Sequence, residues 1–363
     1  MTRARTNANV TAAVGRNMII NGAMNVAQRS ASVTGLGAST TGYHTVDRFA
    51  LESSSSNAGV LTMTQTADGP NGISANCTKL DCTTADTSIA SAEYLLFRQR
   101  FEGQNIQRFG KGVAGAKQTT VSFYVKASAA FTFGCELRDH DNGRQITKLF
   151  DVTTAWNRIE LTFPADVDDG SSPFADDNAL SLDVAFWLHA GATYTGAALN
   201  TAAWADTVTN KRAAGIDSFF SNTANNFFIT GVQMEIGPVA TEFEQEEISV
   251  TLDKCQRYFE RILTLDAYGF FGSGTAYDAD TATVGVIYKT KRAEPTLAFS
   301  ATSHFTVQHG STNMDPAQFS GIQYGLDRAL VDANGSGGLT TGLAIILISK
   351  NTTSAYIDVK AEL

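Results

Sequence analysis

Apolar and polar residues alternate along most of the chain between residues 58 and 240. The alternation is clear over 119–128, 157–166 and 180–191, and a period of two is typical of strands with one buried face. Turn residues separate these segments, and Asp141-Asn142-Gly143 is the strongest hairpin signal. The pattern predicts a β-sandwich or barrel of roughly eight or more strands.

The spacing of apolar residues changes inside the segment 227–262, from every second residue to every third or fourth. Alternation at Val232, Met234 and Ile236 ends at Gly237-Pro238, because proline cannot donate to a strand ladder. After an acidic run, apolar residues recur at spacings of three, four and three, at Leu252, Cys255, Phe259 and Ile262. This spacing predicts a helix over about 251–262 with an a/d stripe of barely two heptads. The stripe packs either against its own chain or against neighbouring chains.

A second β unit of about 100 residues follows, with roughly seven strands, the number found in a small sandwich. We therefore expect an all-β protein: an N-terminal jelly-roll β-sandwich, a short linking α-helix and a smaller C-terminal β-sandwich. The boundaries are an N-terminal arm at 1–16, the jelly roll at 17–246, the helix at 247–264 and the C-terminal sandwich at 265–363. The polar arm is either a frayed terminus or a segment that orders on a partner.

Composition excludes several classes of protein. A net charge of −9 and a pI near 5.1 argue against a nucleic-acid partner, which requires clustered Lys and Arg. The longest apolar run, 343–348, is too short to span a membrane, and the N-terminus lacks the apolar core of a signal peptide. We expect a protein made in the cytoplasm, with four reduced cysteines, although Cys77 and Cys82 are close enough in sequence to pair.

No catalytic motif is present, and the five histidines have no local metal-binding partner, so we expect no enzymatic activity, no metal and no cofactor. A glycosidase needs only two carboxylates, which leaves that alternative open. The acidic loop 164–178 fits a solvated turn better than a calcium loop. Asp47 beside Arg48 suggests a catalytic or ligand pair or, more simply, a structural anchor at the start of a strand. In the strand 91–103 we expect the charged side chains to face solvent.

Candidate binding residues are aromatic. The loop 189–218 is long for a sandwich connection, and its Tyr194 and Trp204 are suited to stacking on a sugar ring. In the alternative interpretation, Trp204 packs back over the edge of the sandwich. In the second unit, exposed aromatics predict a receptor site or an intersubunit contact, at Tyr268, Phe270, Phe271 and Tyr277.

Five motifs occur in one order: Asn17-Met-Ile-Ile-Asn21-Gly22, Tyr43-His-Thr-Val-Asp47-Arg48-Phe49, Ile229-Thr-Gly-Val-Gln-Met-Glu-Ile-Gly237, Ala240-Thr-Glu-Phe243-Glu and Cys255-Gln-Arg-Tyr-Phe259. This order resembles a group of bacteriophage tail-fibre and other virion proteins with a carbohydrate-binding-module-like jelly roll. The chain departs from them at Met24 and Val26, where larger aromatics are common, and at Phe49, where Trp is common. The resemblance implies a virion component without enzymatic activity, and trimers are common in the group.

The resemblance therefore predicts a homotrimeric tail fibre, or fibre-like appendage, that attaches non-covalently to a glycan or protein of the host surface. It favours the a/d stripe of Leu252, Cys255, Phe259 and Ile262 as a trimer contact. Other tail or virion proteins are expected to bind the arm or the jelly roll. Two alternatives are a polysaccharide-degrading tail protein and a purely structural fibre or head decoration.

Overall fold

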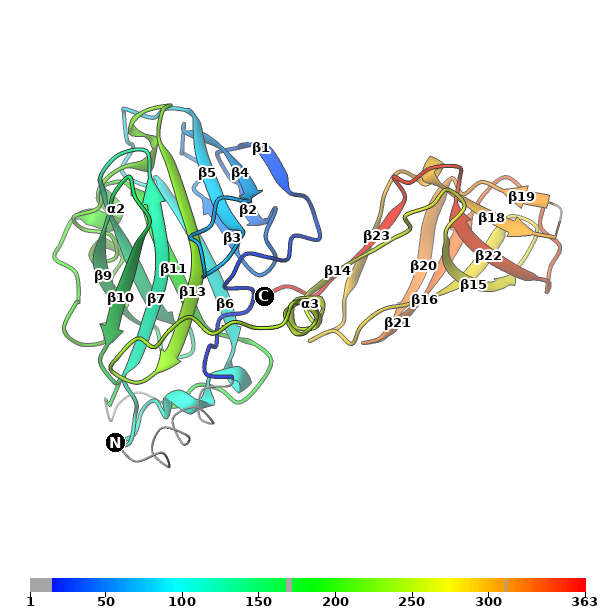
Figure 1. Cartoon of the computed structure of the whole chain (residues 1–363). Helices are drawn as coiled ribbons and strands as arrows, with labels where there is room; N and C mark the ends of the chain where they lie inside the picture. Colours follow the sequence, from blue (N-terminus) through cyan, green and yellow to red (C-terminus); the bar gives the residue numbers. More distant parts are fainter. Residues whose placement is uncertain (1–14, 168–171, 311) are drawn as a thin grey trace. The chain divides into compact units, whose positions relative to one another are not determined.

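The computed structural model describes residues 15–167, 172–310 and 312–363. The chain divides into two compact units, one reaching from the N-terminal side to Leu252 and including Leu363, the other spanning Asp253–Glu362. Strands dominate both units, which confirms the predicted all-β class (Figure 1). None of the described helices has the length and apolar character needed to cross a membrane.

The first unit is a jelly-roll sandwich of two antiparallel sheets (Figure 1). In the described residues one sheet has six strands, in the order β1 (Ser32–Leu36), β4 (Val60–Thr66), β5 (Cys77–Thr84), β13 (Asn226–Ile236), β7 (Thr119–Ala127) and β10 (Asn157–Phe163). The other has seven, in the order β12 (Ala205–Asp206), β9 (Arg144–Val152), β8 (Phe131–Asp139), β11 (Leu180–Ala190), β6 (Tyr94–Glu102), β3 (Ala50–Ser53) and β2 (Thr41–Tyr43). The connections include the short helices η1 (Gly103–Asn105), η2 (Gln107–Phe109), α2 (Ala192–Thr195), η3 (Thr209–Lys211) and η4 (Phe219–Ser221).

The space between the two sheets is filled by aromatic and aliphatic side chains. Phe123 of β7 packs edge-on against Phe150 and Phe186 of the facing sheet, with ring centroids 5.0 and 4.9 Å apart. All three rings are buried, as period-two alternation requires. Because one face of each sheet is used up by this core, binding residues must come from the outer faces or the loops.

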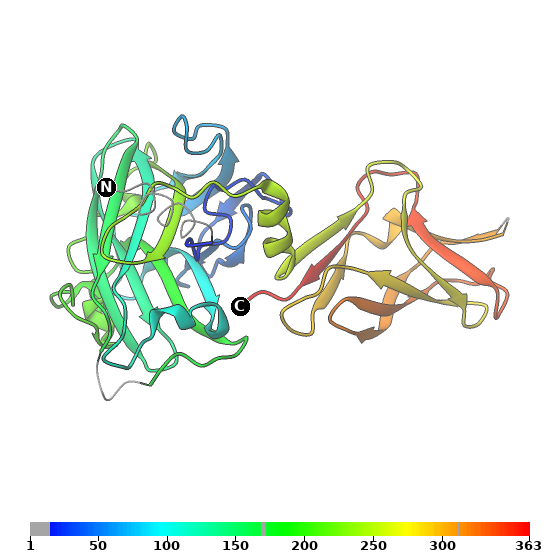
Figure 2. The ribbon, with the colours of Figure 1, turned by 60° about the horizontal axis from the view of Figure 1, so that its bottom comes forward.

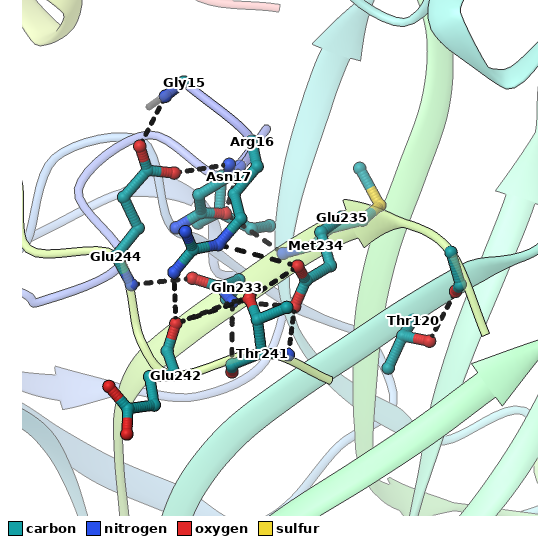
Figure 3. A network of polar contacts seen from close by, with 12 residues as sticks. Gly15, Arg16, Asn17, Thr120, Gln233, Met234, Glu235, Thr241, Glu242 and Glu244 are labelled. Carbon is teal, nitrogen blue, oxygen red and sulfur yellow. Dashed lines mark hydrogen bonds and ion pairs between the residues drawn. The ribbon is translucent and has the colours of Figure 1, made fainter. Parts of the chain in front are cut away.

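Residues 15–22, the N-terminal strap, are fixed to β13 by a dense polar network (Figure 3). The Asn17 side chain donates to the Val232 carbonyl (3.2 Å) and accepts from the Met234 amide (3.0 Å). The Glu244 carboxylate accepts from the main-chain N–H groups of Gly15 and Asn17. A small cavity of about 30 Å³ beside the strap is lined partly by these residues, whose polar groups are already partnered. The first sequence motif therefore has a structural role.

The predicted linking helix is shorter than its apolar spacing indicates. Helix α3 covers Ile248–Gln256, and the chain then forms strand β14 (Phe259–Leu263) (Figure 2). β14 pairs with β23 (Tyr356–Lys360), and Arg261 binds both carboxylate oxygens of Asp358 at 2.7 and 2.9 Å. The prediction of a helix through Ile262 is therefore wrong, because this long-range pairing outweighs a local helical spacing.

The second unit is the smaller sandwich predicted from the sequence. In the described residues one sheet has three strands, β14, β23 and β17 (Thr296–Phe299). The other has seven, in the order β19 (Thr312–Met314), β18 (Phe305–His309), β22 (Ala344–Ser349), β15 (Phe270–Ala276), β16 (Thr281–Ile287), β21 (Arg328–Asn334) and β20 (Gln318–Tyr324), and helix η5 (Thr302–His304) precedes β18. Its core is a cluster of its own, which includes Val284, Val331 and Leu347.

Candidate functional site

The outer face of the seven-stranded sheet carries charged side chains in register. Across β6, β11 and β8, Arg98 lies opposite Ala185, which lies opposite Glu136. One step along, Arg100, Asp183 and Arg138 form the next row. Since side chains alternate between faces, these positions point away from the core that Phe97 and Phe186 occupy. The expectation that the charges of 91–103 face solvent is wrong for Glu93, Arg98 and Glu102, which are buried.

The long loop after β11 folds back over this face and buries it. Tyr194 of α2 packs on Tyr94 and Trp187, with ring centroids 5.3 Å away in both cases. Ala213 and Ile216 from the end of the loop pack in the same small cluster. Residues from this loop thereby form the wall of a pocket whose other side chains belong to the sheet.

This cavity, the outer-face pocket, has a volume of about 210 Å³ and is lined by Glu52, Tyr94, Leu96, Arg98, Arg138, Trp187, Tyr194 and Arg212. Trp187 is fully buried, and its indole N–H donates to Glu136 at 3.0 Å. The Arg212 guanidinium lies over the Trp187 ring, 4.7 Å from its centroid. The lining thus combines aromatic surface with guanidinium groups.

Two of the three arginines are neutralised by carboxylates. Arg212 binds both oxygens of Glu136, at 2.9 and 2.6 Å. Although burial opposes its charge, Glu136 raises the pKa of Arg212. Arg98 pairs with Glu52 and, at 3.2 Å, with Asp183. These pairs hold the charged side chains in fixed positions around the pocket.

Arg138 is different. Within the described residues it makes no hydrogen bond or ion pair, and its Nε is buried without a partner. Burial, and then the nearby Arg212, lower the pKa of Arg138, because both disfavour the charged guanidinium. A buried donor without an acceptor is costly, so an incoming oxygen acceptor, above all an anionic one, would be stabilised here.

A hydroxyl donor completes the pocket. The Tyr94 hydroxyl donates to Glu52 at 2.8 Å. Burial, and then this carboxylate, raise the pKa of Tyr94 to about 12, so the phenol keeps its proton at neutral pH. Guanidinium, hydroxyl and carboxylate groups beside aromatic rings are able to bind a polyhydroxylated ligand through hydrogen bonds and ring stacking.

Of the two aromatic residues predicted in the long loop, only Tyr194 lines the pocket. Trp204 is 8% exposed, belongs to the main core, and donates its indole N–H to the Pro164 carbonyl at 2.9 Å. Trp204 therefore packs back over the edge of the sandwich, as the alternative interpretation predicted. Trp204 is therefore not available to stack on a ligand.

The four aromatics of the second unit divide into two groups. Tyr268, Phe270 and Tyr277 are 59%, 59% and 71% exposed, at and beside the two ends of β15. Phe271 is 5% exposed and belongs to the core of that unit, so its assignment as a surface residue is wrong. Among the described residues no ring contact joins the three exposed side chains.

The predicted trimer stripe is not an exposed surface. Cys255 and Phe259 are fully buried within the chain, and Leu252 and Ile262 are half-buried. Phe259 and Ile262 also lie on β14 and not on the helix. Cys255 and Phe259 are therefore withdrawn from any intersubunit contact, and Leu252 and Ile262 keep only part of their surface for one.

The remaining sequence candidates have structural roles. Asp47 and Arg48 are buried, and Arg48 donates to the Arg100 carbonyl at 2.8 Å, as an anchor would. Asp166 of the acidic loop is bound by both ends of the Arg144 guanidinium, at 2.8 and 2.9 Å, whereas Asp168 and Asp169 lie outside the described residues. All four cysteines are buried thiols outside any disulfide, so the possible Cys77–Cys82 disulfide is not formed.

Sequence reasoning missed the arginines of the outer-face pocket. Each one looks like an ordinary solvated charge on an alternating strand or in a polar loop. Their convergence depends on the register of β6, β11 and β8 and on the return of the loop that carries Arg212. The one available signal was the unusual length of that loop.

No protein-family model matches the sequence, and no curated protein matches it. Among solved structures, the chain is similar to a family 11 carbohydrate-binding module from Clostridium thermocellum in complex with a β-1,3-1,4-mixed-linked tetrasaccharide (12% identity, 58% of this chain and 99% of that chain, TM-score 0.28). It is also similar to TmCBM61 in complex with β-1,4-galactotriose (8% identity, 61% and 100%, TM-score 0.29) and to the CBM22-1–CBM22-2 tandem of Paenibacillus barcinonensis Xyn10C (11% identity, 93% and 100%, TM-score 0.26). With TM-scores this low, these likenesses carry no argument, and the fold rests on the strand pairing described above.

Proposed function

We propose that this protein is a non-enzymatic glycan-binding component of a virion, a tail fibre or fibre-like appendage that attaches to a host surface. The observation that carries the binding proposal is Arg138, a partly buried guanidinium without a hydrogen bond or ion pair in the described residues, in a cavity walled by aromatic rings. In the part of the chain that the structure describes, Glu136 and Asp183 lie near enough to act on its charge but do not hydrogen-bond to it, so a ligand would supply the missing acceptor.

The chemistry of the pocket favours an acidic sugar unit. A carboxylate or other anionic substituent suits the free guanidinium of Arg138, while the rings of Tyr94 and Tyr194 provide a surface for the apolar face of a pyranose. The volume of about 210 Å³ lies below the range of about 300–1,000 Å³ that drug-sized ligands occupy. The pocket therefore suits one sugar residue of a longer chain.

The virion role is supported by the five ordered motifs. Asn17 and Gly22 of the first motif bind Val232 of the third, so these two motifs are joined within the jelly roll. We expect a homotrimer that assembles in the host cytoplasm and is then incorporated into the particle, with the arm or jelly roll contacting other virion proteins. Because Cys255 and Phe259 are buried, we expect most of the trimer contact to lie outside the Leu252–Ile262 stripe.

The test is binding of the purified protein to an array of acidic and neutral glycans, followed by calorimetric titration with the best ligand. We expect Arg138→Ala to weaken binding of an acidic glycan by about tenfold or more, the effect of losing one charge-assisted hydrogen bond. Arg328→Ala is the matched control, since Arg328 is exposed in the second unit and should leave binding unchanged.

Three outcomes would contradict the proposal. Equal affinity of the wild type and Arg138→Ala would remove the pocket as the binding site. Release of soluble sugar from host polysaccharide would identify a degrading enzyme instead. Intact virions are labelled with an antibody to this protein. Failure of the antibody to label the particles would refute the virion role. Light scattering of the purified protein would test the trimer.

A further inference from the structure

A second polar cluster lies in the first unit, apart from the residues that line the outer-face pocket. Asp86 follows β5, Glu93 directly precedes β6, and His189 is the penultimate residue of β11. Their exposed fractions are 4%, 2% and 0%, and one donor atom from each lies within 4.8 Å of the other two. We propose that Asp86, Glu93 and His189 bind a divalent transition-metal ion, with Zn²⁺ as the best fit.

Two atoms of this cluster face each other without a hydrogen bond. Glu93 Oε2 and His189 Nε2 are 3.4 Å apart, and both are buried without a hydrogen-bond partner. The other ring nitrogen, His189 Nδ1, is 2.8 Å from the Ser218 hydroxyl. If Nδ1 donates to Ser218, Nε2 presents a lone pair, as it does in metal-binding histidines whose second nitrogen is fixed by an outer hydrogen bond. A lone pair and a carboxylate oxygen at this distance require a proton or a cation between them.

The charges also require a cation. Asp86 accepts hydrogen bonds from the main-chain N–H groups of Ala58 (3.2 Å) and Ser88 (3.1 Å), and its carboxyl group lies within hydrogen-bonding reach of Glu93. Neither Asp86 nor Glu93 forms an ion pair with a lysine or arginine in that part of the chain. Two buried carboxylates without a counter-charge are strongly unfavourable, and a divalent ion would neutralise both.

The distances between the donor atoms suit a small ion with few ligands. Bond lengths of about 2.0–2.1 Å in a tetrahedral zinc site place neighbouring donor atoms about 3.3–3.4 Å apart. The Glu93–His189 separation of 3.4 Å matches this edge, and a small shift of Asp86 would close the triangle. Three protein donors with one imidazole suit Zn²⁺, whereas Ca²⁺ takes six to eight oxygens.

The surroundings hold the ligands in place. The His189 ring packs edge-on against Phe220, with centroids 5.4 Å apart, and Phe219 and Phe220 are both fully buried. The site would tie the ends of three chain segments together at the end of the sandwich.

The alternative is a proton shared between Asp86 and Glu93. Burial, and then Asp86, raise the pKa of Glu93, which is compatible with either a proton or a metal at this position. The two cases differ in one respect. A metal site takes up an ion and a shared proton does not, so titration of metal-free protein with ZnCl₂ separates them.

We expect protein dialysed against a chelator to bind one Zn²⁺ per chain and to unfold at a higher temperature when loaded. Glu93→Gln, which keeps the shape, and His189→Gln should each weaken Zn²⁺ binding by about 100-fold. Replacement by Co²⁺ should give the visible absorption of a four-coordinate ion. His309→Gln, a change at a histidine outside the cluster, is the control and should bind Zn²⁺ like the wild type.

The proposal is overturned if the wild type takes up no Zn²⁺, Mn²⁺ or Co²⁺, or if Glu93→Gln binds Zn²⁺ as tightly as the wild type. Because His189 is fully buried, the result for His189→Gln is used only if that variant has a native circular dichroism spectrum. If it does not, the result for Glu93→Gln decides. Glycan binding is measured on the same samples, so failure of the metal proposal is distinguished from failure of the outer-face pocket.

Discussion

Asp47 is fully buried in the first sandwich, where its carboxylate accepts hydrogen bonds from the Gln28 main chain and from Arg29 at 3.3 and 3.4 Å. The main-chain carbonyl of Asp47 accepts a hydrogen bond from the Asn21 side-chain amide at 3.0 Å, which joins the first two motifs. A residue in this setting acts through the fold and not through a ligand.

We therefore expect Asp47→Ala to lower the free energy of unfolding by about 3 kcal/mol, because it leaves Arg29 without its buried carboxylate. Urea unfolding measures the difference. Asp315→Ala removes an exposed partner of Lys350 and should cost less than about 1 kcal/mol. A stable Asp47→Ala variant that no longer binds glycan would instead support the ligand-pair interpretation.

At the scale of elements, the N-terminal strap and β13 fit together with no space for a larger residue. The Val232 amide donates to the Gly22 carbonyl at 3.0 Å, next to the bulge that interrupts the pairing of β13 with β7. A Cβ atom on Gly22 would lie 2.1 Å from the Val232 carbonyl oxygen. Both atoms belong to main chain, so neither can move away alone.

We expect Gly22→Ala to destabilise the first unit by more than about 2 kcal/mol, the range for overpacking against fixed neighbours. Thermal unfolding followed by circular dichroism measures it. Gly115→Ala is the matched control, since a Cβ there meets no atom within 4 Å. A melting temperature of Gly22→Ala equal to that of Gly115→Ala would show that the strap is loosely held.

The strands were predictable where apolar and polar residues alternate along the sequence. Segments 119–128, 157–166 and 180–191 form β7, β10 and β11 because their apolar periodicity is local. The end of α3 was not predictable in this way. Phe259 and Ile262 keep a helical spacing, yet Arg261 pairs with Asp358, a residue far along the chain.

The candidate sites were even less predictable, because they depend on the register in which the strands pair. Tyr194 was found because its loop is long, but the position of Arg138 opposite Asp183 follows only from the pairing of β8 with β11. Likewise Glu93 and His189 meet only because the end of β11 and the start of β6 are antiparallel neighbours. Short-range patterns contain no information on such pairings, which is why the histidines appeared isolated in the sequence.

At the scale of the whole molecule, each unit has a hydrophobic core of its own, one of them including Leu61 and the other Leu347. Calorimetry should therefore resolve two unfolding transitions. Leu61→Ala and Leu347→Ala each remove a fully buried side chain at a cost of about 2–5 kcal/mol. We expect each variant to lower the temperature of one transition and to leave the other unchanged. A single transition that both variants shift equally would contradict this independence.

The pairing of β14 with β23 brings together the places where the chain enters and leaves the second unit, since Phe259 lies opposite Lys360. A unit whose entry and exit are neighbours can be lengthened, shortened or exchanged without moving the strands of the preceding unit. Recombination at this one place in the structure would therefore exchange the second unit for an unrelated one. The architecture permits rapid change of the surface carried by Tyr268, Phe270 and Tyr277 while the jelly roll and its pocket stay constant.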